Sequence, residues 1–288
     1  MLYVQTFVSG ALSAGVLTLI AVGFSLQWRS LKLVNLAHFS LVLACAYITY
    51  DLAMRTKVDP FVFALVVVPA AALVSVAFQW VMDHFAVTVF NSLLLTFGVF
   101  ILVEGAITDI WGGDFLRISA DVSPYSTKSF TVLGIAVPVA PLIATLLATI
   151  IVAAYAVFIR NSYFGKALRA VAQDREIAVA YGVNYRRVAS LLAAGNGAAA
   201  GLAGVLVAVS GAVYPTQSEA WIGLVFAVVI LGGIGSPVGA LVSAVMIGVI
   251  MGLGSTKWGT SAAQLIMFVI LILVLLWQTE GLFKRLRT

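Results

Sequence analysis

Charged residues are scarce in this sequence: Asp, Glu, Lys and Arg make up 9% of its 288 residues, whereas 62% are hydrophobic. Soluble domains carry roughly 25% charge, so this chain lacks the polar surface that would cover it in water. A spanning helix needs about 20 mostly apolar residues, which leaves room for about 8–10 transmembrane helices. Continuous apolar runs also exclude the alternating pattern of membrane barrel strands. The sequence predicts an all-α polytopic membrane protein, with a single transmembrane domain over residues 1–288.

Cysteine and histidine are nearly missing. Cys45, the single cysteine, lies in an apolar run, so an internal disulfide and a cysteine metal cluster are excluded. His38 and His84 stand isolated, with no acidic residue at metal-ligand spacing. No nucleophile is paired with a base, so we expect no metal site, no bound cofactor and no enzyme activity.

The formal charge of +5 does not require a nucleic-acid partner, because membrane proteins concentrate Lys and Arg in cytoplasmic loops. The start of the chain lacks the basic region of a cleaved signal, and we expect a retained first helix. With the N-terminus outside, one side receives two basic residues near residue 30, six between Arg160 and Arg187 and three in the tail, 11 in all, against 5 on the other. This asymmetry predicts an outside N-terminus and a cytoplasmic C-terminus.

Nine apolar stretches are candidates for crossings, and two of them are short. They cover about residues 3–26, 35–52, 61–82, 87–110, 138–159, 188–210, 221–231, 240–252 and 262–278. If 221–231 turned back instead of crossing, both ends of the chain would lie on one side. Between crossings, 111–137 is predicted to be an extracytoplasmic loop, in which 127–139 could form a short hairpin.

The longest basic segment, 160–187, is predicted to be cytoplasmic and partly helical. An amphipathic helix of this kind either lies on anionic lipid head groups or docks a soluble partner. Its apolar stripe is Phe164, Leu168 and Val171, and its polar stripe, at i, i+3, i+7 and i+10, is Lys166, Arg169, Gln173 and Glu176.

Small residues mark two further features. Pairs of glycines four residues apart, such as Gly197 and Gly201, allow close helix packing. The stretch GGIGSPVG is predicted to break or pack a helix, a break being tolerated inside a membrane only when buried or lining a cavity. It lacks the Lys-Ser/Thr ending of a phosphate loop, so we expect no ATP bound by this chain. The candidate residues of this stretch are Gly232, Gly233, Gly235, Ser236 and Gly239.

Few polar side chains lie inside the predicted spans. Glu104 stands out, since burying an ionised carboxylate near the bilayer centre costs at least about 2.5 to 3.5 kcal/mol. It either lines a solute route or makes a structural hydrogen bond, and the same alternatives apply to the polar start of the second span. The candidate route residues are Asn35, His38, Ser40, Thr96 and Glu104.

Four motifs resemble the permeases of branched-chain amino acid ABC importers, in order from about Gly23 to Gly252. They are VNLAHFS, LLLTFGVFILVEG before IWGGD, RAVAQDREIAVAYGVN and FAVVILGGIGSPVGAL. Within the third, the spacing from Glu176 through Ala178 to Gly182 is similar to the Glu-Ala-Ala-x-x-x-Gly loop by which ABC importer permeases engage their ATPases. The chain departs from the pattern at Phe39, where relatives commonly have glycine.

The resemblance implies a type II-like ABC importer permease fold in a bacterial inner membrane, related to the smaller of two permease subunits. It implies a second related permease, two ATPases that hold ATP and Mg²⁺, and an extracytoplasmic solute-binding protein. The implied cargo is branched-chain amino acids, with urea, short amides or other small organic solutes as alternatives. A self-sufficient secondary transporter or channel is the rival class. The candidate ATPase-coupling residues are Gly165, Lys166, Arg169, Gln173, Asp174, Arg175, Glu176, Ala178 and Gly182.

Overall fold

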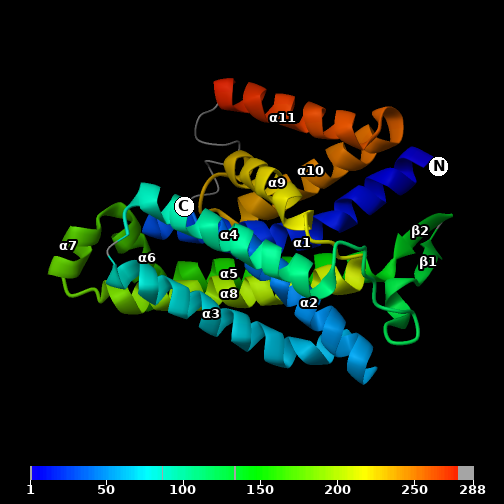
Figure 1. Ribbon diagram of the computed structural model, residues 1–288. Coiled ribbons are helices and arrows are strands. Elements are labelled where there is room, and N and C mark those ends of the chain that lie inside the picture. The colour runs from blue at the N-terminus through cyan, green and yellow to red at the C-terminus, as the bar shows by residue number, and fades with distance from the viewer. Residues whose placement is uncertain (1, 86, 133, 278–288) are drawn as a thin grey trace.

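The computed structural model describes residues 2–85, 87–132 and 134–277, whose helices and strands are shown in Figure 1. The α-helices are α1 (Leu2–Leu31), α2 (Ala37–Thr56), α3 (Ala64–His84), α4 (Val89–Trp111), α5 (Val139–Asn161), α6 (Tyr163–Gln173), α7 (Arg175–Ala180), α8 (Tyr185–Ser210), α9 (Gln217–Gly232), α10 (Pro237–Trp258) and α11 (Thr260–Trp277). Short 3-10 helices cover Pro60–Phe63 and Pro124–Ser126, and strands β1 (Ser129–Val132) and β2 (Ile135–Pro138) form an antiparallel hairpin.

The architecture is helical apart from this hairpin, within the described ranges. In the part of the chain that the structure describes, seven helices are long and apolar enough to cross a membrane, and α9 and α11 are shorter apolar helices. The predicted all-α polytopic fold is therefore confirmed. The hairpin expected within 127–139 is also present, with Ser129 opposite Pro138 and Val132 opposite Ile135.

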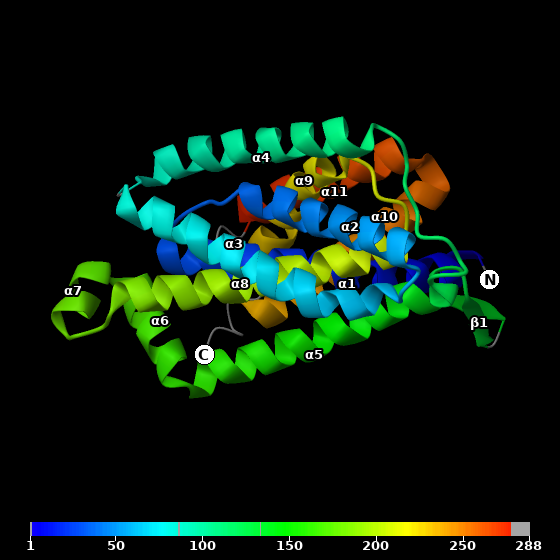
Figure 2. The ribbon, with the colours of Figure 1, turned by 60° about the horizontal axis from the view of Figure 1, so that its bottom comes forward.

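The helix bundle has two distinct ends, which are visible in Figures 1 and 2. The hairpin end carries β1 and β2 beside the start of α1, where the Gln5 side chain exchanges hydrogen bonds of 2.6 and 2.7 Å with the backbone of Ala136. The basic end carries α6 and α7. These two names are kept below.

Helix α9 crosses from the hairpin end to the basic end. The segment before it pairs through Val213 with Leu116, in the loop that follows α4. The turn after it lies beside the last turn of α1, where Arg29 Nη1 donates to the Gly235 carbonyl oxygen (3.3 Å). With 16 residues the helix is about 24 Å long, shorter than the hydrocarbon core of about 30 Å. Because its two ends lie at opposite ends of the bundle, the stretch 221–231 does not turn back, and α10 and α11 each reverse direction after it (Figure 1).

Helices α1 and α8 lie inside the bundle, and α3, α4 and α5 lie around it (Figure 2). In the most apolar window of α8, 72% of the residues are buried, against 11% for the span that contains α3 and 17% for α4 and α5. The exposed side chains of these outer helices are largely apolar, as expected for helices that face lipid.

Close helix packing depends on glycine at several crossings. A Cβ on Gly201 of α8 would lie 2.9 Å from Val68 Cα on α3, and one on Gly197 would collide with the Ala71 carbonyl group. Where α1 crosses α10, the backbones of Gly10 and Gly248 leave no room for a side chain. These contacts bring the helix backbones together as small residues do in membrane bundles.

The GGIGSPVG stretch forms the turn between α9 and α10. Gly233 and Gly235 have φ of +84° and +79°, which L-residues with a side chain rarely adopt. Ser236 caps α10, its Oγ accepting a hydrogen bond from Gly239 N at 3.0 Å. Gly232 and Gly239 pack backbone to backbone across the turn. The tight turn sets the start of α10 at the basic end.

The first span is longer than predicted, because α1 continues to Leu31 instead of ending near residue 26. Its last turn is held by partners inside the bundle: Arg29 bonds to Gly235, and Gln27 lies 2% exposed among other amides. The sequence prediction ended the span at the first polar residues, but their partners come from distant helices.

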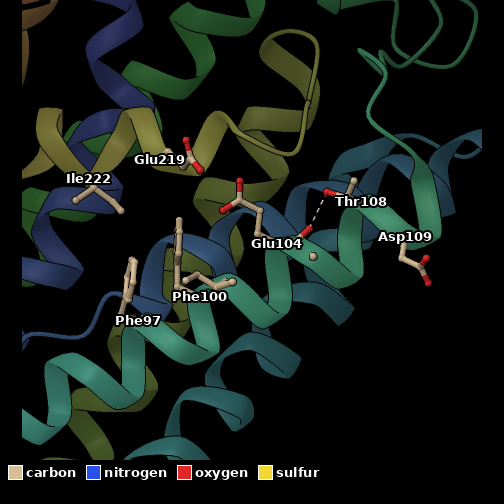
Figure 3. Close-up of a pocket in the computed structure, with 9 residues that line it drawn as sticks. Phe97, Phe100, Glu104, Thr108, Asp109, Glu219 and Ile222 are labelled. Carbon is tan, nitrogen blue, oxygen red and sulfur yellow. Dashed lines mark hydrogen bonds between the residues drawn. The ribbon is translucent and has the colours of Figure 1, made fainter.

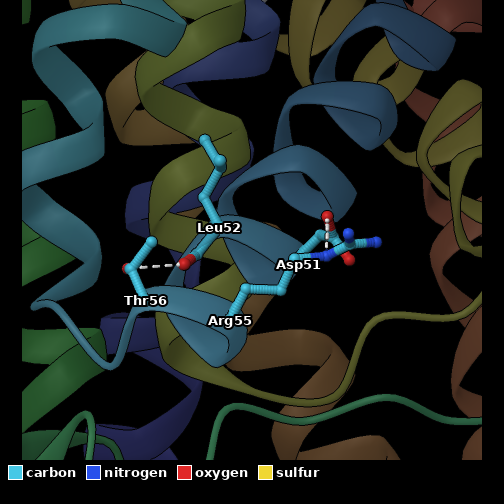
Figure 4. Close-up of polar contacts among 4 residues, drawn as sticks. All are labelled: Asp51, Leu52, Arg55 and Thr56. Carbon is cyan, nitrogen blue, oxygen red and sulfur yellow. Dashed lines mark hydrogen bonds and ion pairs between the residues drawn. The ribbon is translucent and has the colours of Figure 1, made fainter.

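At the hairpin end, α2 finishes with local polar contacts (Figure 4). Arg55 Nε lies 2.8 Å from Asp51 Oδ2, and Thr56 Oγ1 donates to the Leu52 carbonyl oxygen at 2.7 Å. The Arg55 side chain is 76% exposed, so we assign this i,i+4 pair only about 0.3–0.5 kcal/mol. It stabilises the helix end locally.

Candidate functional site: the basic end and the buried polar groups

The basic segment folds as two helices rather than one. Helix α6 begins after Ser162, whose Oγ accepts from Gly165 N at 3.0 Å. Asp174 is extended (φ −150°, ψ 114°), and its Oδ1 accepts from the amides of Glu176 (2.9 Å) and Ile177 (3.0 Å) to start α7. The predicted polar stripe is therefore wrong for Glu176, because the Asp174 cap interrupts the helix before that residue.

One side of α6 and α7 packs against the bundle. Gly165 lies so close to the Ile159 carbonyl group of α5 that a side chain there would collide with it. Leu168, Val171 and Ala178 are buried as well. Arg169 reaches back to α5, donating from Nη1 to the Ile159 oxygen at 2.8 Å.

The other side is open and carries most of the predicted coupling residues. Its exposed members are Lys166, Gln173, Asp174, Arg175, Glu176 and Gly182, and Arg169 is also exposed although its guanidinium reaches back to α5. Gly182, with φ +88°, ends α7, and its amide donates to the Val179 oxygen at 2.9 Å. The candidate coupling set therefore divides between a packed face and an open face.

Sequence reasoning missed an apolar patch on α7. Ile177 is 57% exposed, Val179 48% and Tyr181 88%, directly after the exposed charged residues Asp174, Arg175 and Glu176. We call these three residues the α7 patch. Its signal in the sequence is three large apolar residues between Glu176 and Gly182. Exposed apolar side chains with a polar rim are typical of protein interaction sites.

Helix α7 is joined to the bundle through a series of polar contacts. The Arg175 guanidinium carbon lies 3.6 Å from the centroid of the Tyr185 ring on α8. The Tyr185 hydroxyl donates to Asp83 Oδ1 on α3 (3.3 Å), and Gln79 Nε2 donates to the same oxygen (3.2 Å). These contacts link the open face of α7 to two spanning helices.

The series continues into a buried amide cluster, formed by Gln27, Asn35, Gln79 and Asn196. Gln27 lies at its centre: its Nε2 donates to Gln79 Oε1 at 3.4 Å, and its Oε1 accepts from Asn196 Nδ2 at 3.3 Å and Asn35 Nδ2 at 3.5 Å. Each side chain is at most 7% exposed. The cluster ties α1, α3 and α8 together, and of the predicted route residues it contains Asn35.

Three other predicted route residues are held by nearby groups. His38 Nε2 lies 3.2 Å from the Ile20 oxygen, and Ser40 Oγ donates to the Ala37 oxygen at 3.1 Å. Thr96 Oγ1 accepts from the amide of Leu36 at 3.1 Å, so Thr96 and Asn35 meet at the same short connection between α1 and α2. Their contribution to a solute route stays a prediction.

Glu104 lies apart from these residues, in a groove between α4 and α9 with a volume of about 700 Å³. Phe97, Phe100 and Ile222 line it, and Figure 3 shows the carboxylates of Glu104 and Glu219 pointing toward the same space. Glu219 lies in the first turn of α9, which begins at Gln217, four residues before the predicted crossing at 221–231. The prediction treated Glu104 as a solitary intramembrane carboxylate, and the fold gives it an acidic neighbour.

Comparison with known proteins identifies the family. Residues 6–275 match the family described as "Branched-chain amino acid transport system / permease component". The chain belongs to this permease family. It is 27% identical to the high-affinity branched-chain amino acid transport system permease protein LivH of Salmonella typhimurium, over 98% of this chain and 96% of that protein. The corresponding protein of Escherichia coli K12 is 26% identical over the same shares.

The permease family also includes a more distant relative, the protein BraD of Pseudomonas aeruginosa, which is 24% identical over 98% of this chain and 96% of its own length. No solved structure matches the chain. As a member of the branched-chain amino acid permease family, the chain is a multi-pass transport subunit and not an enzyme. The resemblance noticed in the four motifs is thereby confirmed over nearly the full length.

Proposed function

We propose that this chain is a transmembrane subunit of an ATP-driven importer that moves branched-chain amino acids into the cytoplasm. The α7 patch is the observation that carries the proposal. Its apolar side chains are exposed, with Glu176 and Arg175 at the rim, and such a surface is typical of a binding site for another protein. That protein is an ATPase, and the spacing from Glu176 to Gly182 agrees with this choice.

The closure of the ATPases is coupled to the spanning helices through the side-chain contacts between α7 and the bundle. When the ATPases close, they displace α7, and the Arg175–Tyr185 contact passes the displacement to α8. Asp83 and Gln79 pass it to α3, and the amide cluster connects both helices with α1. Charge-assisted and amide hydrogen bonds are directional, so a shift in one partner reorients the next.

The partners are two cytoplasmic ATPases that hold ATP and Mg²⁺, a second related permease and an extracytoplasmic solute-binding protein. The basic end faces the cytoplasm, in agreement with the excess of Lys and Arg on that side. The N-terminus then lies outside, beside the hairpin that receives the binding protein. The basic tail at 284–287, which contributes to the charge count, lies outside the described residues.

The cargo is proposed from the relatives, whose names specify branched-chain amino acid transport. Urea, short amides and other small organic solutes are the competing cargoes.

Reconstitution in proteoliposomes tests the proposal. Uptake of radiolabelled leucine is measured with the chain alone, and with the second permease, both ATPases and the binding protein added. We expect uptake only with the full set and ATP. Leucine uptake by the chain alone would instead indicate a secondary transporter or channel, and ATP-driven uptake of urea without leucine would overturn the cargo.

A further inference from the structure

A second cavity lies at the basic end, beneath α6. It is a half-open pocket with a volume of about 450 Å³, lined by the last turns of α1 and α5, the inner face of α6 and the first turn of α10. Its walls are partly apolar, from Leu26, Ala156, Ile159, Leu168 and Val238. We call it the α6 pocket. It is separate from the α7 patch and from the groove that contains Glu104.

Three arginines line the α6 pocket, Arg29, Arg160 and Arg169, and among the described residues that line it there is no Asp or Glu. They come from three different helices, so the fold alone brings them together. Their charges make the electrostatic potential of the pocket positive, which favours an anion there. Arg29 and Arg169 each use one Nη1 for a backbone carbonyl oxygen, that of Gly235 and that of Ile159. Arginine also carries five N–H donors in a planar fork that fits phosphate oxygens.

The start of α10 adds to this positive potential. This helix has 22 residues, and its first turn, with Ser236 as the cap and Pro237 at the first position, lines the pocket. A helix N-terminus carries a partial positive charge that favours anions. Since Pro237 has no N–H and the Gly239 amide donates to Ser236 Oγ, this turn contributes mainly its dipole. Gly235, which immediately precedes the cap, leaves room for Arg29 only because it has no side chain.

We propose that the α6 pocket binds the phosphate of an anionic phospholipid. The position selects a lipid over a free phosphate ion, because the pocket lies at the ends of spanning helices, where head groups lie. Its apolar wall accepts the glycerol and the start of an acyl chain. Basic pockets between transmembrane helices on the cytoplasmic side bind acidic head groups elsewhere.

The bound head group would connect α6 with α1, α5 and α10, since residues of all four helices line the pocket. Helix α6 would then be held from its membrane side by a lipid, while α7 presents its patch to the ATPase. This site does not depend on which solute is carried, so its failure would leave the proposed transport function untouched.

Native mass spectrometry of the full chain in a neutral detergent tests the site. The probes are phosphatidylglycerol, phosphatidylcholine and inorganic phosphate. We expect selective retention of phosphatidylglycerol, and at least about tenfold weaker retention in the double variant R160Q/R169Q, because charge-assisted hydrogen bonds are lost. The control R186Q/R187Q removes the same charge from the exposed start of α8, outside the pocket, and should retain the lipid like the unmodified chain.

Equal retention of both lipids, or equal losses in the two double variants, would overturn the proposal. Retention of inorganic phosphate without selective lipid retention would assign the pocket to a free anion and overturn it as well. A photoactivatable phosphatidylglycerol provides a test that needs no variant. Its cross-links should map to α6 and the start of α10, and cross-links confined to other helices would contradict the site.

Discussion

The guanidinium of Arg175 stacks on the ring of Tyr185, with 3.6 Å between the guanidinium carbon and the ring centroid. Arg175 begins α7 and Tyr185 begins α8, so this contact spans the short connection between the open face of the basic end and the most buried helix of the bundle. The hydroxyl group of the same tyrosine donates a hydrogen bond to Asp83 Oδ1. A single side chain thus joins the proposed docking helix to α3 and α8.

Replacement of Tyr185 by phenylalanine separates these two contacts. Y185F keeps the ring under Arg175 but loses the hydrogen bond to Asp83, and bonds to charged groups contribute about 1.5–3 kcal/mol. We expect ATPase binding to persist and transport to fall about tenfold. Uptake and co-purification are measured together. The control Y163F changes a tyrosine that is 88% exposed and should transport normally; equal rates for both variants would argue against the proposed coupling path.

Gly182 is tested by its conformation. At φ +88° a valine is strained by at least about 1–2 kcal/mol, so G182V should distort the end of α7 and lower the yield of the ATPase complex about tenfold. Gly259 offers a matched control, because it has φ +86° and open space around it but lies between α10 and α11, away from α7. Complex formation by G259V should match the unmodified chain. A full yield of the ATPase complex with G182V would contradict a role of Gly182 in docking.

Glu104 is tested by removal of its charge. In the groove it faces Glu219, and E104Q should reduce transport about tenfold while assembly stays intact, if the carboxylate makes a charge-assisted contact during the cycle. Asp109 lines the same groove, but its carboxylate points away from Glu219 (Figure 3), so D109N is the control for the loss of a carboxylate that does not face Glu219. Uptake rates and complex yields are compared in proteoliposomes. Normal uptake by E104Q would indicate that Glu104 has only a structural role.

Helix packing predicts opposite effects for two glycine-to-alanine changes. G197A places a methyl group against the Ala71 carbonyl and Ser75, and overpacking of this kind costs about 1–3 kcal/mol. G98A meets open space on α4 and should leave stability unchanged or raise it by up to about 1 kcal/mol. Unfolding in detergent, followed by circular dichroism, measures both. Similar stabilities would mean that α3 and α8 can move apart without cost.

Several features followed from local sequence alone. Long apolar runs determined the membrane fold and most helix positions, because a spanning segment satisfies its backbone hydrogen bonds within itself. The turn at 233–236 was foreseeable from its glycines and the Ser-Pro pair. The predicted polar stripe of 160–187 was wrong at Glu176, because the Asp174 side chain accepts hydrogen bonds from two backbone amides and starts a new helix. Helical spacing alone does not predict such a cap.

Only the tertiary structure decided which residues meet. Gln27, Asn35, Gln79 and Asn196 are up to 169 positions apart, and nothing in their sequence neighbourhoods indicates one buried cluster. In the same way, the crossing of the helices places Glu219 beside Glu104 in one groove and brings three arginines of three helices to one pocket. Hydrophobic periodicity reports which residues avoid water, whereas polar contacts depend on how helices cross, and in this chain glycines at the crossings determine that.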